Sequence, residues 1–276
     1  MRGGEAVILA LGLTLAGCAT VAESPKPAPV AAAPTKERLA EEGHALYLRQ
    51  EWDRAAEVLG EALAMDTTSL PVLKDLAALY YERATFAEGR DSTARRGDLA
   101  RARAYFVRLE AAGARDADVY ERLCETSVAL GDARGFLLSA RAYARQYPYD
   151  RQYYNLGLAQ FGAGEYQETI RSQKEAIEKF PRSEYIGGFY RQLGHSYMKV
   201  DRDQTADRTL SAGLQAADRK MAELGAKGES KGTAYERLRA DKVAMLLMLK
   251  KICQTYKFTE RIASLDRQLK EAGYRP

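Results

Sequence analysis

Apolar and small residues recur every three or four positions along most of the chain that follows residue 35. In residues 36–69 they include Leu39, Gly43, Leu46, Ala55 and Leu59. This spacing places them on one face of each of two helices. Four of the eight prolines lie between residues 25 and 34, which leaves the rest of the chain largely free of helix breakers. The pattern predicts an all-α protein.

The helical pattern also repeats. Leu130-Gly131-Asp132 aligns with Ala163-Gly164-Glu165 at an offset of 33 residues, and Tyr147-Pro148 aligns with Phe180-Pro181 at the same offset. A period of this length is typical of arrays in which each unit is a pair of helices.

The repeat resembles the tetratricopeptide repeat (TPR), whose first helix reads aromatic-x2-Leu-Gly-x2-Tyr. Tyr190, Leu193, Gly194 and Tyr197 match that half, with tyrosine in the tryptophan position. The resemblance implies a right-handed superhelical solenoid of helical hairpins. Small residues would let neighbouring helices approach, and large residues would fill the seams between them.

The resemblance divides residues 35–216 into about five units. These are 36–69, 70–116, 117–149, 150–183 and 187–216, and the second carries an insertion at 84–96 that is expected to be a helix extension and a loop. After residue 216 the match decays, and residues 217–276 are expected to form a loop and a divergent capping hairpin. Its apolar cluster at 245–249 is expected to be core rather than a membrane or partner helix.

The start of the chain has the pattern of a secretory signal peptide, with an apolar stretch from Ala6 to Ala16 that is too short to span a bilayer. Leu15-Ala16-Gly17-Cys18 resembles the lipobox of bacterial lipoproteins. The resemblance implies that 1–17 is removed and that Cys18 is lipidated, palmitate included. Because Ala19 rather than aspartate follows, we expect an outer-membrane anchor with the repeats in the periplasm.

Residues 18–34 contain prolines at 25, 27, 29 and 34 and no hydrophobic period. Such a segment is expected to be an extended tether between the lipidated cysteine and the repeats. Contact with the membrane is then expected through the lipid anchor only.

Composition argues against several functions. The net charge of +4 on 276 residues gives no case for nucleic acid. His44 and His195 are the two histidines, and neither belongs to a metal-ligand motif or a recognisable catalytic set. Cys124 and Cys253 are expected to be buried thiols, with a disulfide as the alternative. We therefore predict a protein that is not an enzyme and has no cofactor, metal site or small-molecule substrate.

In the TPR family, certain positions of each first helix face a groove that binds a protein partner. Transferring those positions to this chain predicts a groove rich in aromatic and basic side chains, which are frequent anchors of protein interfaces. The predicted partner-binding residues are Tyr47, Lys74, Tyr81, Arg151, Tyr154, Phe161, Arg191, His195 and Met198.

The sequence thus predicts a lipid-anchored scaffold or adaptor that assembles an envelope machine at the outer membrane. One form is similar to the pilotins of type IV pilus secretins, lipoproteins made almost entirely of TPR units that help secretin subunits oligomerise. The alternative is a scaffold lipoprotein for outer-membrane protein insertion or polysaccharide export.

Overall fold

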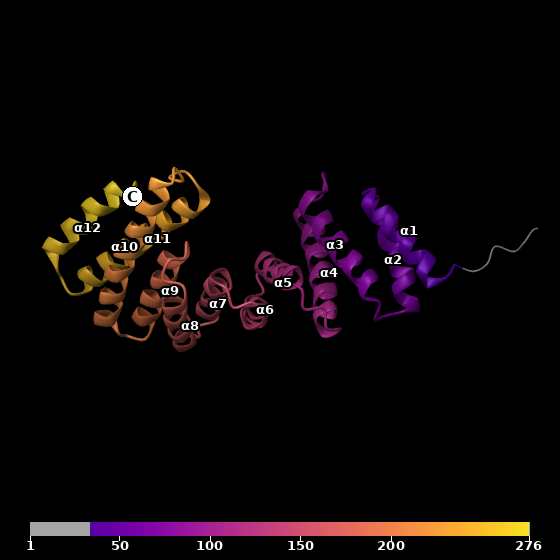
Figure 1. Cartoon of the computed structure of the whole chain (residues 1–276), viewed down its shortest axis with the longest axis horizontal. Coiled ribbons are helices and arrows are strands. Elements are labelled where there is room, and N and C mark those ends of the chain that lie inside the picture. Colours follow the sequence, from indigo (N-terminus) through magenta and orange to yellow (C-terminus); the bar gives the residue numbers. More distant parts are fainter. Residues whose placement is uncertain (1–33, 276) are drawn as a thin grey trace, which may run out of the picture. The chain divides into compact units, whose positions relative to one another are not determined.

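The computed structural model describes residues 34–275 and contains twelve α-helices over that range (Figure 1). The predicted signal peptide, Cys18 and nearly all of the predicted tether therefore lie outside the described residues. The helices are α1 Lys36–Leu48, α2 Trp52–Met65, α3 Leu70–Phe86, α4 Ser92–Ala111, α5 Ala117–Leu130, α6 Ala133–Gln146, α7 Asp150–Gly162, α8 Tyr166–Lys179, α9 Ile186–Lys199, α10 Asp203–Ala226, α11 Thr233–Thr255 and α12 Thr259–Glu271.

Successive helices pack as hairpins, from α1 with α2 to α11 with α12. The predicted all-α array of hairpins is confirmed. The aligned glycines of the sequence repeat have a local reason: Gly131 and Gly164 adopt φ of +72° and +77°, and only glycine reaches that left-handed region without strain. Each lies in the turn between the two helices of a hairpin.

Small residues let the helices of a hairpin approach closely. A Cβ added at Gly43 would lie 2.6 Å from Cγ of Leu59, and one at Gly194 would lie 2.5 Å from Cγ of Leu210. Both leucines are fully buried. A side chain at either glycine would therefore displace a leucine from the core, which explains the glycine of the repeat motif.

The interior contains two separate clusters of buried apolar residues. One extends from Leu39 on α1 to Ala159 on α7, and the other from Tyr153 on α7 to Leu269 on α12. The helix α7 contributes to both. Around α7, α8 and α9 the interior is polar, and its buried side chains are Gln152, Gln160, Thr169, Ser172, Gln173, Gln192 and Ser196.

Gly157 lies in this polar interior. A Cβ added there would lie 1.9 Å from Oε1 of Gln192 and 2.1 Å from Nε2 of Gln173. Those amides are held by backbone carbonyls, since Gln173 donates to Tyr153 at 3.0 Å and Gln192 donates to Tyr154 at 3.3 Å. Gly157 thus makes room for two buried amides rather than for a leucine.

A buried ion cluster joins α3 to α4. Asp98 is completely buried, and its carboxylate accepts from Arg83 at 3.0 and 2.6 Å and pairs with Arg90 at 2.7 Å. Arg83 also donates to Asp53 on α2 at 2.6 Å. Arg95 donates to three carbonyls at the end of α3 and in the following loop. Arginine side chains thus join both ends of the predicted insertion at 84–96 to α3 and α4.

The C-terminal region differs from the predicted boundary at residue 216. The helix α10 continues to Ala226, and the loop before α11 occupies 227–232. Burial of Leu224 favours the longer helix, because it offsets the roughly 1 kcal/mol that Gly225 costs within a helix. Met245, Leu246 and Leu249 are buried in the second apolar cluster, as expected for core residues, whereas Leu247 of the same stretch is 37% exposed. None of the helices within 34–275 combines the length and apolarity that a membrane crossing requires.

Candidate functional site

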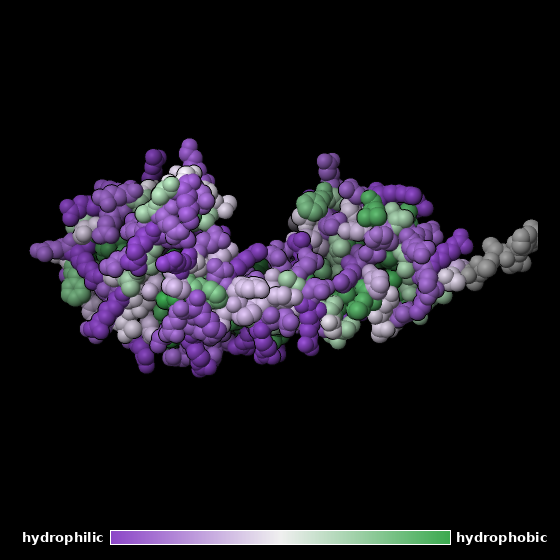
Figure 2. Space-filling model, in the orientation of Figure 1, coloured by the Kyte–Doolittle hydropathy of each residue, from purple (hydrophilic) through white to green (hydrophobic). Residues whose placement is uncertain are grey.

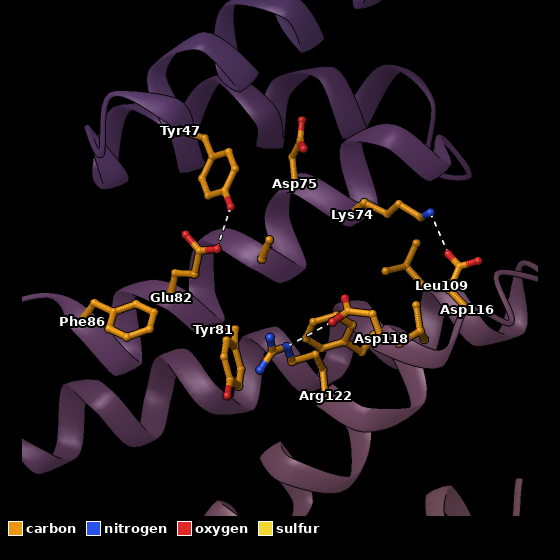
Figure 3. A pocket seen from close by; sticks show the side chains of 13 residues that line it. Tyr47, Lys74, Asp75, Tyr81, Glu82, Phe86, Leu109, Asp116, Asp118 and Arg122 are labelled. Carbon is orange, nitrogen blue, oxygen red and sulfur yellow. Dashed lines mark hydrogen bonds and ion pairs between the residues drawn. The ribbon is translucent and has the colours of Figure 1, made fainter. Parts of the chain in front are cut away.

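Side chains of α1, α3 and α5 line a cavity of about 550 Å³, and Phe106 and Leu109 of α4 complete its lining (Figure 3). Three of the predicted partner-binding residues, Tyr47, Lys74 and Tyr81, line it. The remaining lining residues are Asp75, Ala78, Glu82, Phe86, Phe106, Leu109, Asp116, Asp118, Val119 and Arg122.

A second cavity of about 680 Å³ continues from the first toward the start of α3. The two share Lys74, Asp75 and Asp116, and the second adds His44 and a more apolar wall that includes Leu70. We call the two cavities together the α1–α3–α5 groove.

Tyrosine hydroxyls connect the first helices of successive hairpins along this groove. The Tyr47 hydroxyl on α1 donates to Glu82 on α3 at 2.9 Å, and the Tyr81 hydroxyl on α3 donates to Glu125 on α5 at 2.9 Å. Burial, together with the carboxylate that each hydroxyl faces, raises the pKa of both tyrosines. Both hydroxyls therefore remain protonated donors at neutral pH, and they fix the glutamates in place.

The cations of the main cavity are engaged within the protein. Nζ of Lys74 lies 2.8 Å from Asp116. Arg122 pairs with Glu125 at 2.8 Å and with Asp118 at 3.4 Å, and its guanidinium lies 4.4 Å from the centre of the Tyr81 ring. The main cavity is lined by four carboxylates and two cations, a balance of −2 in a chain of net charge +4.

Two apolar side chains are exposed where α1 and α3 end. Leu48 is 68% exposed and Phe86 is 69% exposed. Figure 2 shows apolar residues at the surface of these helices within a face that is otherwise mainly hydrophilic. Because Phe86 also lines the cavity, the groove combines acidic groups with an exposed aromatic ring.

The groove contains a histidine–carboxylate pair, with Nδ1 of His44 2.9 Å from Oδ2 of Asp75. Such a pair can activate a nucleophile when one is within reach. The lining of the second cavity, which holds both residues, includes no serine, threonine or cysteine among the described residues. Asp75 can therefore orient the His44 ring, but the lining of this cavity offers the pair no serine, threonine or cysteine to activate.

Three other predicted partner-binding residues make polar contacts between first helices outside this groove. Arg151 on α7 pairs with Glu121 on α5 at 2.6 Å. Arg191 on α9 pairs with Asp241 on α11 at 2.6 Å and lies 3.5 Å from the Tyr154 hydroxyl. Asp241 is buried, and that burial raises the pKa of its carboxyl group, with Arg191 opposing the rise. Arg191 thus neutralises a buried carboxylate.

Phe161, His195 and Met198 also lie on α7 and α9. The rings of Phe161 and His195 are 4.3 Å apart, and Met198 packs against the second apolar cluster. Burial lowers the pKa of His195, and the nearby cations Lys199, Arg191 and Lys251 lower it further. The structure therefore separates the predicted set into three residues in the groove and six on α7 and α9.

Sequence reasoning missed Asp75, Phe86 and Arg122, which also line the main cavity. Asp75 and Arg122 occupy first-helix positions that the family pattern does not assign to the groove. Phe86 belongs to the extension of α3 and has no counterpart in the motif. The repeat register gave no signal for these three residues.

Among residues 34–275 no group of three or more histidine, cysteine, aspartate or glutamate side chains is arranged to hold a metal ion. Cys124 and Cys253 are free and buried. Burial raises the pKa of the Cys124 thiol to about 12 and also raises that of Cys253.

Comparison with known proteins gives a likeness of fold. No family model and no curated protein matches the sequence. Among solved structures, a crystal structure of the MamA protein is 17% identical, with a TM-score of 0.48 over 68% of this chain and 94% of that one. YrrB, described as a TPR protein with an unusual peptide-binding site, is 16% identical, with a TM-score of 0.48 over 69% and 91%. MamA from Desulfovibrio magneticus RS-1 is 17% identical, with a TM-score of 0.44 over 67% and 96%.

Proposed function

We propose that this chain is a non-enzymatic scaffold that binds an extended segment of a partner protein in the α1–α3–α5 groove. The observation that carries the proposal is the lining of the main cavity. It combines two tyrosines whose hydroxyls donate to glutamates, further carboxylates and the exposed ring of Phe86 over a volume of about 550 Å³. Aromatic rings surrounded by polar groups are typical of surfaces that bind other proteins.

The proposal includes a lipid anchor. If Cys18 is lipidated as its lipobox-like context implies, the scaffold works at the periplasmic face of the outer membrane. A protein with multiple acyl chains stays attached to the membrane. Within this proposal, the form to test first is pilotin-like assistance to secretin assembly for type IV pili.

Crosslinking in cells tests the groove. We would replace Ala78, which lines the main cavity, with a photo-crosslinking amino acid in the chain expressed in its own organism, and identify the captured protein by mass spectrometry. The control carries the same amino acid at Glu61, an exposed position on α2 that is not part of the groove. We expect one envelope protein to be captured from position 78 and not from position 61.

The identity of the captured protein decides between the candidate machines. A secretin subunit would support the pilotin-like role, whereas a barrel-assembly or polysaccharide-export component would support the alternative. Equal capture from both positions would contradict binding in the groove. The anchor is tested separately, because Cys18→Ser should abolish palmitate labelling and release the protein from membranes.

A further inference from the structure

Two carboxylates of the groove lie on one face of α3 and have no lysine or arginine partner among residues 34–275. Asp75 and Glu82 are seven residues apart, which corresponds to two helical turns and about 10 Å along the axis. The described hydrogen-bond partners of their carboxylates are His44 and the Tyr47 hydroxyl. No lysine or arginine among residues 34–275 forms an ion pair with either carboxylate. Lys74, the neighbour of Asp75, pairs with Asp116 instead.

The other acidic groups of this wall already contact a cation of the protein. Arg122 pairs with both Asp118 and Glu125, and its guanidinium covers the Tyr81 ring. A cation that entered the groove would therefore gain most from the two carboxylates on α3. The small side chain between them, Ala78, lines the cavity and leaves room for a ligand backbone to pass.

The axial spacing of Asp75 and Glu82 along α3 fits an extended ligand conformation. In a polyproline II helix the residues i and i+3 lie on the same side, about 9 Å apart. That distance matches the roughly 10 Å between Asp75 and Glu82. In a β-strand the residues i and i+3 point to opposite faces, so only one of two such cations would reach the wall. The exposed ring of Phe86, one turn beyond Glu82, would contact the ligand beyond its second cation.

We propose that the groove recognises a proline-rich, extended segment of its partner that carries two basic residues three positions apart. This inference rests on the proposed function and adds the chemistry of the bound segment. The two cations pair with Asp75 and Glu82, and the following residues of the segment pack on Phe86.

Peptide binding tests the inference. The probe is a fluorescent, proline-rich dodecapeptide with lysines at i and i+3, and its comparison peptides carry glutamine at both positions or place the lysines at i and i+2. Fluorescence anisotropy with the full chain in detergent gives the affinities. We expect the i, i+3 lysine peptide to bind about tenfold more tightly than either comparison peptide, since each partly exposed ion pair contributes a few-fold.

The protein variants provide a matched pair. Asp75→Asn combined with Glu82→Gln keeps hydrogen-bond acceptors for His44 and Tyr47 but removes both charges, and it should eliminate the tenfold preference. Glu61→Gln on α2 removes an exposed carboxylate outside the groove and should leave the preference unchanged. A thermal melt of each variant confirms that the fold is retained. If the double variant is unfolded, the comparison between peptides on the unaltered chain still decides.

The outcomes separate this inference from the proposed function. If lysine and glutamine peptides bind with equal affinity, and Ala78→Trp prevents binding of both, the groove binds peptides but the inference is wrong. If the i, i+3 lysine peptide does not bind at all, the inference is wrong, and crosslinking from position 78 then decides the proposed function independently. Retention of the lysine preference in the double variant would also overturn the inference.

Discussion

Replacing Asp98 with asparagine should destabilise the protein far more than the same change at Asp53. Both carboxylates accept a hydrogen bond from Arg83 at 2.6 Å. The Asp98 side chain is completely buried and also pairs with Arg90, whereas the Asp53 side chain is 91% exposed. The two substitutions thus remove the same kind of charge from the same arginine in opposite environments.

The magnitude follows from burial. Asparagine at position 98 keeps the shape of the side chain but leaves the buried guanidinium of Arg83 without its buried counter-charge. Removing one partner of a buried ion pair costs about 3–5 kcal/mol, whereas an exposed pair contributes about 1 kcal/mol or less. For a chain of this size, each kcal/mol lowers the melting temperature by about 2–4 °C. Asp98→Asn should therefore lower the melting temperature by roughly 6–20 °C, and Asp53→Asn by less than about 4 °C.

Two probes make the assay local as well as global. Circular dichroism follows all the helices, whereas fluorescence of Trp52, the single tryptophan, follows the start of α2 beside Asp53. Hairpin arrays can unfold in more than one step. In Asp98→Asn, the midpoint temperature followed by Trp52 fluorescence should therefore fall at least as much as the midpoint followed by circular dichroism. Equal shifts in the two variants would refute the reasoning, because burial would then contribute nothing to the ion cluster.

Three further outcomes are expected. Gly157→Ala should destabilise the protein by about 1–3 kcal/mol because its Cβ would displace buried amides. Gly60→Ala, where a Cβ meets nothing within 4 Å, should stabilise it by about 0.5–1 kcal/mol. Thermal melts should therefore show melting temperatures that shift in opposite directions. The pKa of His195 is lowered in the folded protein, so the unfolded chain binds a proton at this residue at higher pH than the folded chain does. The protein should therefore lose stability as the pH falls through 6.5. Urea denaturation at pH 7.5 and 5.5 should show a loss of stability that His195→Gln reduces, and an unchanged loss in the variant would contradict this role. Cys124 and Cys253 should resist iodoacetamide at pH 8 until the protein unfolds, as judged by peptide mass spectrometry, because burial raises the pKa of each thiol; rapid native labelling would be inconsistent with that burial.

The hairpin array was predictable because its signal is local and repeated. Leu39, Gly43 and Leu46 return to one helix face every three or four residues, and the turn glycines recur at a fixed offset. The end of α10 was not predictable in this way. In the sequence, Gly225 indicates the end of a helix. Only the burial of Leu224 against other helices explains why α10 continues past residue 216.

The groove was predictable only in part because a repeat register gives the direction of a side chain but not its neighbours. Tyr47 and Tyr81 lie where the register places them, in the main cavity. Arg191 occupies the same register position as Lys74 of the groove, yet it pairs with Asp241, 50 residues further along the chain. That partner belongs to the divergent C-terminal hairpin, for which the family pattern offered no positions.

The helix α7 gives Tyr153 to one apolar cluster and Ala159 to the other. Every other helix with residues in these clusters belongs to just one of them. Gene duplication or deletion could therefore lengthen or shorten the array at either end by whole hairpins without disturbing the opposite cluster. Evolutionary change in the number of hairpins should be tolerated at the ends and selected against at α7.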